Sequence, residues 1–194
     1  MNEKELNPAE SLSIITGMIN TAKNRLADDG FLIIFWGWLV FSAALINYVS
    51  LAFQSDYGYL VWPVLMPAGG IFTAIYSARK NRNNVVDSYT KSFLGYCWTA
   101  FIIALAIALS FMPLHGVKLT YFVLMLLYGI VSFITGGILS FRPLVIGSLF
   151  SFAFAILAGL SGDKEQFLCI AGALLCSYII PGHLLRSKYK SQNV

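Results

Sequence analysis

The sequence predicts an all-α, polytopic membrane protein with six transmembrane helices in three hairpins, preceded by an amphipathic N-terminal helix. The first observation is composition: the 194 residues are 58% hydrophobic and 11% charged, with a mean hydropathy of +0.73. A soluble domain carries about 25% charged residues, so too few polar groups remain to cover a water-exposed surface. The second observation is a set of six stretches without Asp, Glu, Lys or Arg, at 31–53, 59–78, 93–113, 119–141, 144–160 and 166–185. Each falls within the length of about 17–25 residues that crosses a bilayer as a helix.

Residues 1–30 are expected to form a cytoplasmic helix on the membrane surface. Asn7 suits the N-cap, with Pro8 at the first helical position and Glu10 three residues after the cap, which resembles a capping box. Gly30 suits the end of this helix. Apolar positions at helical spacing define a candidate partner face, made of Leu12, Ile15, Ile19 and Leu26. Because such a helix can lie in the headgroup region, this face either packs against the bundle or docks a partner.

The distribution of lysine and arginine predicts the orientation of the spans. With the N-terminus in the cytoplasm, eleven basic residues fall on the cytoplasmic side, and only Lys118 and Lys164 fall on the other. We therefore expect a multi-pass protein of the cytoplasmic (inner) membrane with both termini in the cytoplasm, residues 31–186 as the bundle and 187–194 as a basic tail. The net charge of +4 reflects this asymmetry. It favours contact with the lipid bilayer through anionic headgroups and gives no reason to expect nucleic acid.

Small residues recur about every four positions within the spans. The fifth span has Gly147, Ser151, Ala155 and Gly159 at this spacing. Helices in lipid associate by close backbone approach, which small residues allow. These stripes predict close packing within the bundle, with a homo-oligomer through the same stripes as the alternative.

Two tryptophans of the first span, Trp36 and Trp38, flank Gly37. Trp38 lies roughly 12 Å beyond Gly30 along a helix axis, which is deeper than the aromatic belt at headgroup level. An indole N–H at that depth needs an acceptor, so we expect Trp38 to face the bundle or a polar recess. Trp36 is shallower and is expected to anchor at the interface, while Gly37 allows a neighbouring helix to approach.

The second span is the most irregular, because Pro67 is followed by Gly69 and Gly70. A proline removes a backbone donor and clashes with the preceding turn, so we expect a kink. Transporters place substrate groups at broken helices, although neighbouring helices also satisfy freed backbone groups without any such role. The candidate ligand recess at this depth consists of Trp38, Asn47, Pro67, Gly70, Tyr96 and Thr135.

Chemically reactive groups are sparse. The spans hold no charged side chain, and such charges are the usual parts of proton relays and ion paths. His115 and His183 fall at opposite membrane faces, and the cysteines lie inside spans without metal-type spacing. No catalytic triad, carboxylate pair, P-loop or dinucleotide fingerprint is present. We therefore expect no enzyme activity, no catalytic residue, no cofactor and no metal.

Two segments resemble known families of membrane proteins. The stretch ESLSIITGMINTAKNRLADDGFLIIFWGWLVF, at 10–41, resembles small uncharacterised prokaryotic six-span membrane proteins in which a polar helix leads into a Trp-Gly-Trp first span. The stretch GIVSFITGGILSFRPLVIGSLFSFAFAILAGL, at 129–160, is similar to the hairpin unit of the acid-resistance membrane protein family (HdeD-like), in which six spans form three repeats. Neither resemblance supplies a catalytic or binding residue.

The sequence therefore favours a non-enzymatic membrane component that regulates or scaffolds a cytosolic or membrane protein partner through its N-terminal helix. The alternative is a small transporter or channel for a neutral or lipid-like molecule, with its site in the candidate recess. A continuous polar cavity would favour transport, whereas a dry, tightly packed interior would favour partner binding.

Overall fold

A computed structural model of the chain describes residues 17, 30–55, 57–81, 89–162 and 164–192. The described part is helical, without strands, and six of its helices are long and apolar enough to cross a membrane. They are Gly30–Ala52, Val61–Arg79, Ser92–Ser110, Met112–Ile138, Arg142–Leu160 and Glu165–Lys188. The prediction of an all-helical protein with six apolar spans is therefore confirmed. The predicted N-terminal helix lies outside the described residues, apart from Gly17.

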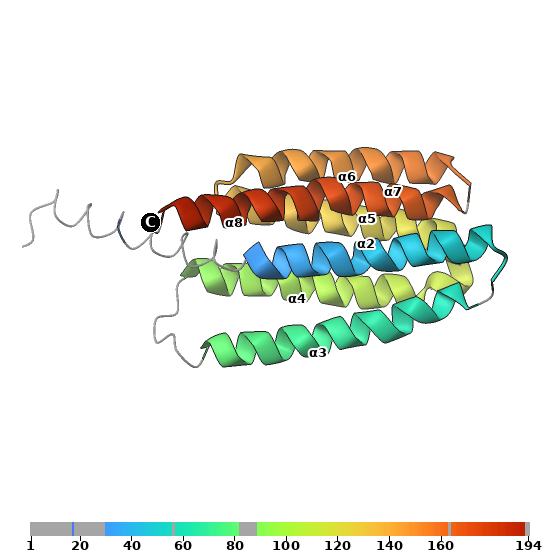
Figure 1. Cartoon of the computed structure of the whole chain (residues 1–194), viewed down its shortest axis with the longest axis horizontal. Helices are drawn as coiled ribbons and strands as arrows, with labels where there is room; N and C mark the ends of the chain where they lie inside the picture. Colours follow the sequence, from blue (N-terminus) through green and yellow to red (C-terminus); the bar gives the residue numbers. More distant parts are fainter. Residues whose placement is uncertain (1–16, 18–29, 56, 82–88, 163, 193–194) are drawn as a thin grey trace, which may run out of the picture.

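The elements follow one another with short connections. In chain order they are α2 (Gly30–Ala52), η1 (Gly58–Leu60), α3 (Val61–Asn81), α4 (Tyr89–Ser110), α5 (Met112–Ile138), α6 (Arg142–Leu160), α7 (Glu165–Leu174), η2 (Leu175–Ile179) and α8 (Ile180–Gln192). Successive spans alternate in direction, so α2 starts at the same end of the molecule at which α8 finishes (Figure 1). We name this the α8 end.

Four of the spans form the packed core: α2, α5, α6 and the continuous run α7–η2–α8. The most extensive contact is between α5 and α6, followed by α6 with α7 and α2 with α7. The fully or almost fully buried side chains in this core include Val40, Ala44, Met125, Ala155 and Leu174. The interior is thus mostly apolar and built by all four spans, with a few buried polar side chains among them, including Ser148, Ser151, Gln166 and Ser177.

Glycines set the close approach between these core helices. A Cβ at Gly37 would lie 2.9 Å from the Cβ of Tyr178, and one at Gly136 would lie 2.9 Å from the backbone nitrogen of Val145. A Cβ at Gly147 would collide with the carbonyl oxygen of Cys176. Gly37 therefore admits a neighbouring helix as expected. Of the small-residue stripe of the fifth span, Gly147, Ser151 and Ala155 are buried, whereas Gly159 is exposed.

The spans α3 and α4 are peripheral. In each of these two spans only 6% of the residues in the most apolar 18-residue window are buried, against 33–56% in the other four spans. α3 contacts α2 and η1, and α4 contacts α5. Figure 1 shows α3 at one edge of the bundle. Each of these two helices is therefore held by one face and leaves most of its surface to the surroundings.

Irregular backbone occurs at two places in the described helices. Gly116 has φ 81° and ψ 167° inside α5, a conformation open to glycine, so the straight part of this helix starts after it. The last span contains the π-helical turn η2 just before Pro181, where the sequence predicts an uninterrupted helix. Proline has no backbone N–H to donate, and the π turn adjusts the hydrogen-bonding pattern of the helix to this missing donor. α8 then continues to Gln192, through most of the predicted tail.

Candidate functional site

The six residues of the candidate recess are distributed over four helices. Trp38, Pro67, Gly70 and Tyr96 are exposed, whereas Asn47 and Thr135 are buried. The two buried side chains already have partners: Asn47 donates to the carbonyl oxygen of Gly58 at 2.9 Å, and Thr135 donates to that of Val131 at 2.6 Å. The six residues therefore do not form a single enclosed recess. α3 runs as a helix straight through Pro67.

The expectation that Trp38 faces the bundle or a polar recess is wrong. Trp38, expected to face the bundle, is 46% exposed and packs its ring against Phe41. Trp36, expected at the interface, is the one that packs between helices, and its Nε1 donates to Oγ1 of Thr73 at 3.0 Å. The reason is that depth in the bilayer does not fix the direction of a side chain; α3 covers the side of α2 that carries Trp36.

Four aromatic rings form a continuous contact between α2 and α3 near the α8 end. Phe35 and Phe72 have ring centroids 4.6 Å apart, and Phe31 and Tyr76 have centroids 5.3 Å apart. Gly69 allows this contact, because a Cβ there would lie 2.9 Å from Cδ1 of Leu39. We name the interface the α2–α3 seam, defined by Phe31, Phe35, Trp36, Gly69, Phe72, Thr73 and Tyr76.

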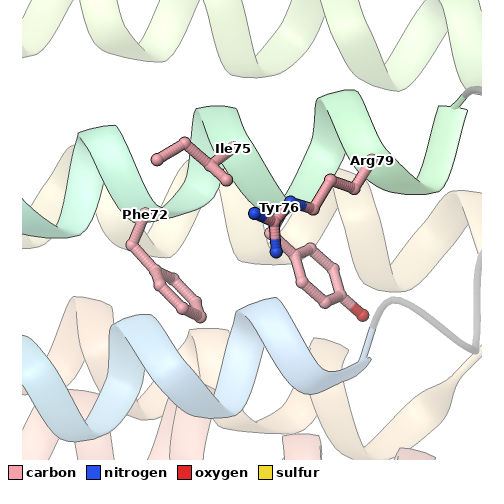
Figure 2. A pocket seen from close by; sticks show the side chains of 4 residues that line it. All are labelled: Phe72, Ile75, Tyr76 and Arg79. Carbon is pink, nitrogen blue, oxygen red and sulfur yellow. The ribbon is translucent and has the colours of Figure 1, made fainter.

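A pocket of about 400 Å³ opens beside this seam and is lined by Phe72, Ile75, Tyr76 and Arg79. In Figure 2, Phe72 and Tyr76 point from α3 toward α2, and Arg79 extends back along α3 toward the other lining residues. Spacings of three and four residues place all four on adjacent parts of one helix face. Three lining side chains present aromatic or aliphatic surface, and the fourth carries a guanidinium.

The sequence prediction missed this pocket, which contains none of the six recess residues. The sequence contained a signal. Phe72, Ile75 and Tyr76 recur at helical spacing, and the next position at that spacing is Arg79, the first arginine after the span. The same pattern is typical of any lipid-facing helix that ends at a membrane surface. All four lining residues belong to α3, and the sequence alone does not show that they line a hollow.

A second feature of α3 is an exposed face of small residues. Pro67, Gly70, Ala74 and Ser77 are all exposed and lie on one side of the helix at spacings of three and four. A Cβ at Gly70 would meet nothing within 4 Å. We name these four residues the small-residue face of α3.

Residues capable of metal or acid–base chemistry are not gathered in the described part of the chain. No group of three or more His, Cys, Asp or Glu residues there could hold a metal ion. Cys97, Cys169 and Cys176 are free thiols on different helices or turns. The buried amide of Gln166 and the indole nitrogen of Trp62 have no hydrogen-bond partner among the described residues.

Comparisons with known proteins add no assignment: no family model, no curated protein and no solved structure matches the chain. The two resemblances stated from the sequence stay predictions.

Proposed function

We propose that this protein is a non-enzymatic membrane component that regulates or scaffolds a partner protein. The observation that carries the proposal is the unequal packing of the spans. Four spans form a tight core, while α3 and α4 are only 6% buried. Packing these two helices on more than one side would add helix–helix contacts and stabilise the bundle, so stability alone does not account for their exposure.

The small-residue face of α3 supports a partner helix in the membrane as the direct contact. Gly69 and Gly70 differ in this respect: Gly69 packs against the side chains of Leu39 and Trp36 on α2, whereas Gly70 has open space beside it. Glycine costs about 1 kcal/mol relative to alanine in a helix interior, and no contact within the described chain requires it at Gly70. A partner that approaches closely along Gly70 and Ala74 supplies the reason.

The proposal includes the orientation predicted from charge. The six spans pair as three hairpins, both termini lie in the cytoplasm, and the α8 end faces the cytoplasm of an inner membrane. The N-terminal helix would then hold a cytosolic or juxtamembrane part of the partner through Leu12, Ile15, Ile19 and Leu26. Support for this orientation comes from the bias of lysine and arginine to one side.

Transport of a neutral or lipid-like molecule is the weaker candidate. A transport path needs a polar or adaptable cavity across the bundle, near the midplane of the spans. Mostly apolar side chains from all four core spans pack the interior instead, and the pocket at Phe72 and Arg79 opens at the periphery. The packed core therefore favours partner binding.

Site-specific photocrosslinking in native membranes tests the proposal. A photoreactive phenylalanine analogue replaces Ile71, which borders the small-residue face and is 63% exposed, or Ile156 on α6, which is 62% exposed. We expect protein adducts from Ile71 and only lipid adducts from Ile156. Removal of residues 1–29 should weaken the adduct from Ile71 if the N-terminal helix binds the same partner.

Equal protein adducts at both positions would show random collision and contradict the proposal. Lipid adducts alone at Ile71, together with substrate flux across proteoliposomes, would favour the transporter.

A further inference from the structure

The pocket beside the α2–α3 seam has the composition of a lipid site. Its walls are Phe72, Ile75 and Tyr76, and its one charged group is the guanidinium of Arg79. An acyl chain is the ligand that matches apolar walls open to the bilayer. A guanidinium binds a phosphate by paired hydrogen bonds.

Arg79 lies at the depth where a lipid phosphate is found. The apolar span of α3 ends at this residue, so its backbone is at the boundary of the hydrocarbon. Long side chains on helices point toward the preceding turn, and Figure 2 shows Arg79 extended that way, over the pocket. The guanidinium therefore sits just inside the boundary, where an unpaired charge is costly.

No protein group in the described part of the chain neutralises Arg79. The one carboxylate there belongs to Glu165, at the start of α7 and thus at the opposite end of the bundle (Figure 1). Aromatic contacts on the seam also hold the pocket wall in place, since Phe72 packs on Phe35 and Tyr76 packs on Phe31. The apolar side of the site is thus packed on α2, and its polar side has no carboxylate among the described residues.

We infer that this pocket binds one anionic glycerophospholipid of the leaflet at the α8 end. The headgroup phosphate pairs with Arg79, and an acyl chain lies along Phe72 and Ile75. Basic pockets between transmembrane helices bind anionic lipids through the same chemistry. The inference is independent of any protein partner and rests only on the depth and lining of the pocket; the proposed orientation makes this leaflet the cytoplasmic one.

Photoactivatable lipids test the inference on the full-length protein in nanodiscs. The probes are phosphatidylglycerol and phosphatidylcholine with the same diazirine-bearing acyl chain, and the readout is labelling of the peptide that contains Phe72–Arg79. We expect phosphatidylglycerol to label this peptide about fivefold more than phosphatidylcholine, which corresponds to about 1 kcal/mol for one arginine near an anionic surface.

Variants assign the preference to the pocket. Arg79→Gln should remove the preference, Arg79→Lys should keep part of it, and Arg142→Gln should leave it unchanged. Arg142 is a matched control, because it is an exposed arginine at the start of α6, also at the α8 end (Figure 1). Ile75→Trp fills the pocket from an exposed position and should lower labelling by both lipids.

Equal labelling by both lipids, or a preference that survives Arg79→Gln, would overturn the inference. Competition by millimolar glycerol phosphate would also overturn it, because the site would then bind a soluble phosphate compound. These readouts detect lipid adducts, so they succeed or fail separately from the protein adducts that test the proposed function.

Discussion

The indole N–H of Trp36 on α2 donates a hydrogen bond to Oγ1 of Thr73 on α3, at 3.0 Å. The hydroxyl of Thr73 in turn donates to the carbonyl oxygen of Gly69, at 2.8 Å. The indole N–H of Trp36 and the hydroxyl of Thr73 therefore both have partners within the protein, as the lipid environment requires. This chain of hydrogen bonds is therefore a polar link between α2 and the peripheral helix α3.

We predict that the Trp36–Thr73 hydrogen bond stabilises the α2–α3 seam by about 0.6 kcal/mol, and by no more than about 1.7 kcal/mol, the range known for such bonds in membranes. Trp36→Phe, Thr73→Val and the double variant give this coupling energy from unfolding in mixed micelles. Thr99→Val is the control, since Thr99 bonds only to Gly95 one turn back on its own exposed face of α4. A coupling energy of zero, or an equal effect of Thr99→Val, would contradict the prediction.

The same residue pair shows how far sequence reasoning reaches. The six spans follow from hydropathy, because each is a property of one segment alone. The side of a helix that meets its neighbours is a property of the whole bundle. Lipid-facing and core-facing positions use the same residue types, so Ile71 is 63% exposed while Ile170 is 4% exposed. The inverted assignment of Trp36 and Trp38, and the pocket at Arg79, both follow from this ambiguity.

Backbone irregularities were predictable only in part. Pro67 lies within α3, and the helix continues through it, whereas Pro181 is preceded by a π-helical turn. The difference is in the surroundings: Pro67 is exposed, and Pro181 is fully buried against the core. The sequence shows two prolines in apolar runs and does not show which one the neighbours constrain.

A second prediction concerns the adjacent glycines Gly136 and Gly137 near the end of α5. A Cβ at Gly136 would lie 2.9 Å from the backbone nitrogen of Val145, whereas one at Gly137 would meet nothing within 4 Å. Backbone cannot yield as a side chain can, so we expect Gly136→Ala to be less stable than Gly137→Ala by about 1–3 kcal/mol, the usual cost of overpacking. Both variants gain the same helix propensity. Thermal or detergent unfolding that gives equal stabilities would show that the α5–α6 contact is looser than described.

A third prediction concerns Gln166, which is fully buried at the start of α7. Neither Nε2 nor Oε1 of its amide has a hydrogen-bond partner among the described residues. A buried polar group without a partner costs free energy, so Gln166→Met, of similar size, should raise the free energy of unfolding by ~1 kcal/mol. Ser151→Ala is the contrasting variant, because Ser151 donates to the carbonyl oxygen of Met125 across the α5–α6 contact at 3.2 Å. Loss of this hydrogen bond should lower the free energy of unfolding. A lower stability of Gln166→Met would reveal that the amide binds a group outside the described chain.

The last prediction uses the two neighbouring glycines of α3 to separate internal packing from partner binding. Gly69→Ala would place a Cβ 2.9 Å from Cδ1 of Leu39 and 3.3 Å from the ring of Trp36. The atoms it meets belong to side chains, which can shift, so it should lower stability by less than Gly136→Ala, whose Cβ meets backbone. Gly70→Ile adds a side chain into open space, so its effect on stability should stay within about 0.5 kcal/mol, as for other exposed positions.

We nevertheless expect Gly70→Ile to lower the photocrosslinked protein adduct at Ile71 about tenfold, which corresponds to about 1.4 kcal/mol of lost helix–helix contact. Gly95→Ile is the matched control, since Gly95 on α4 is also exposed with nothing within 4 Å of a Cβ. If Gly95→Ile lowers the adduct as much as Gly70→Ile, the contact is not specific to the small-residue face. If Gly70→Ile unfolds the protein, the face is part of the bundle and the partner must bind elsewhere.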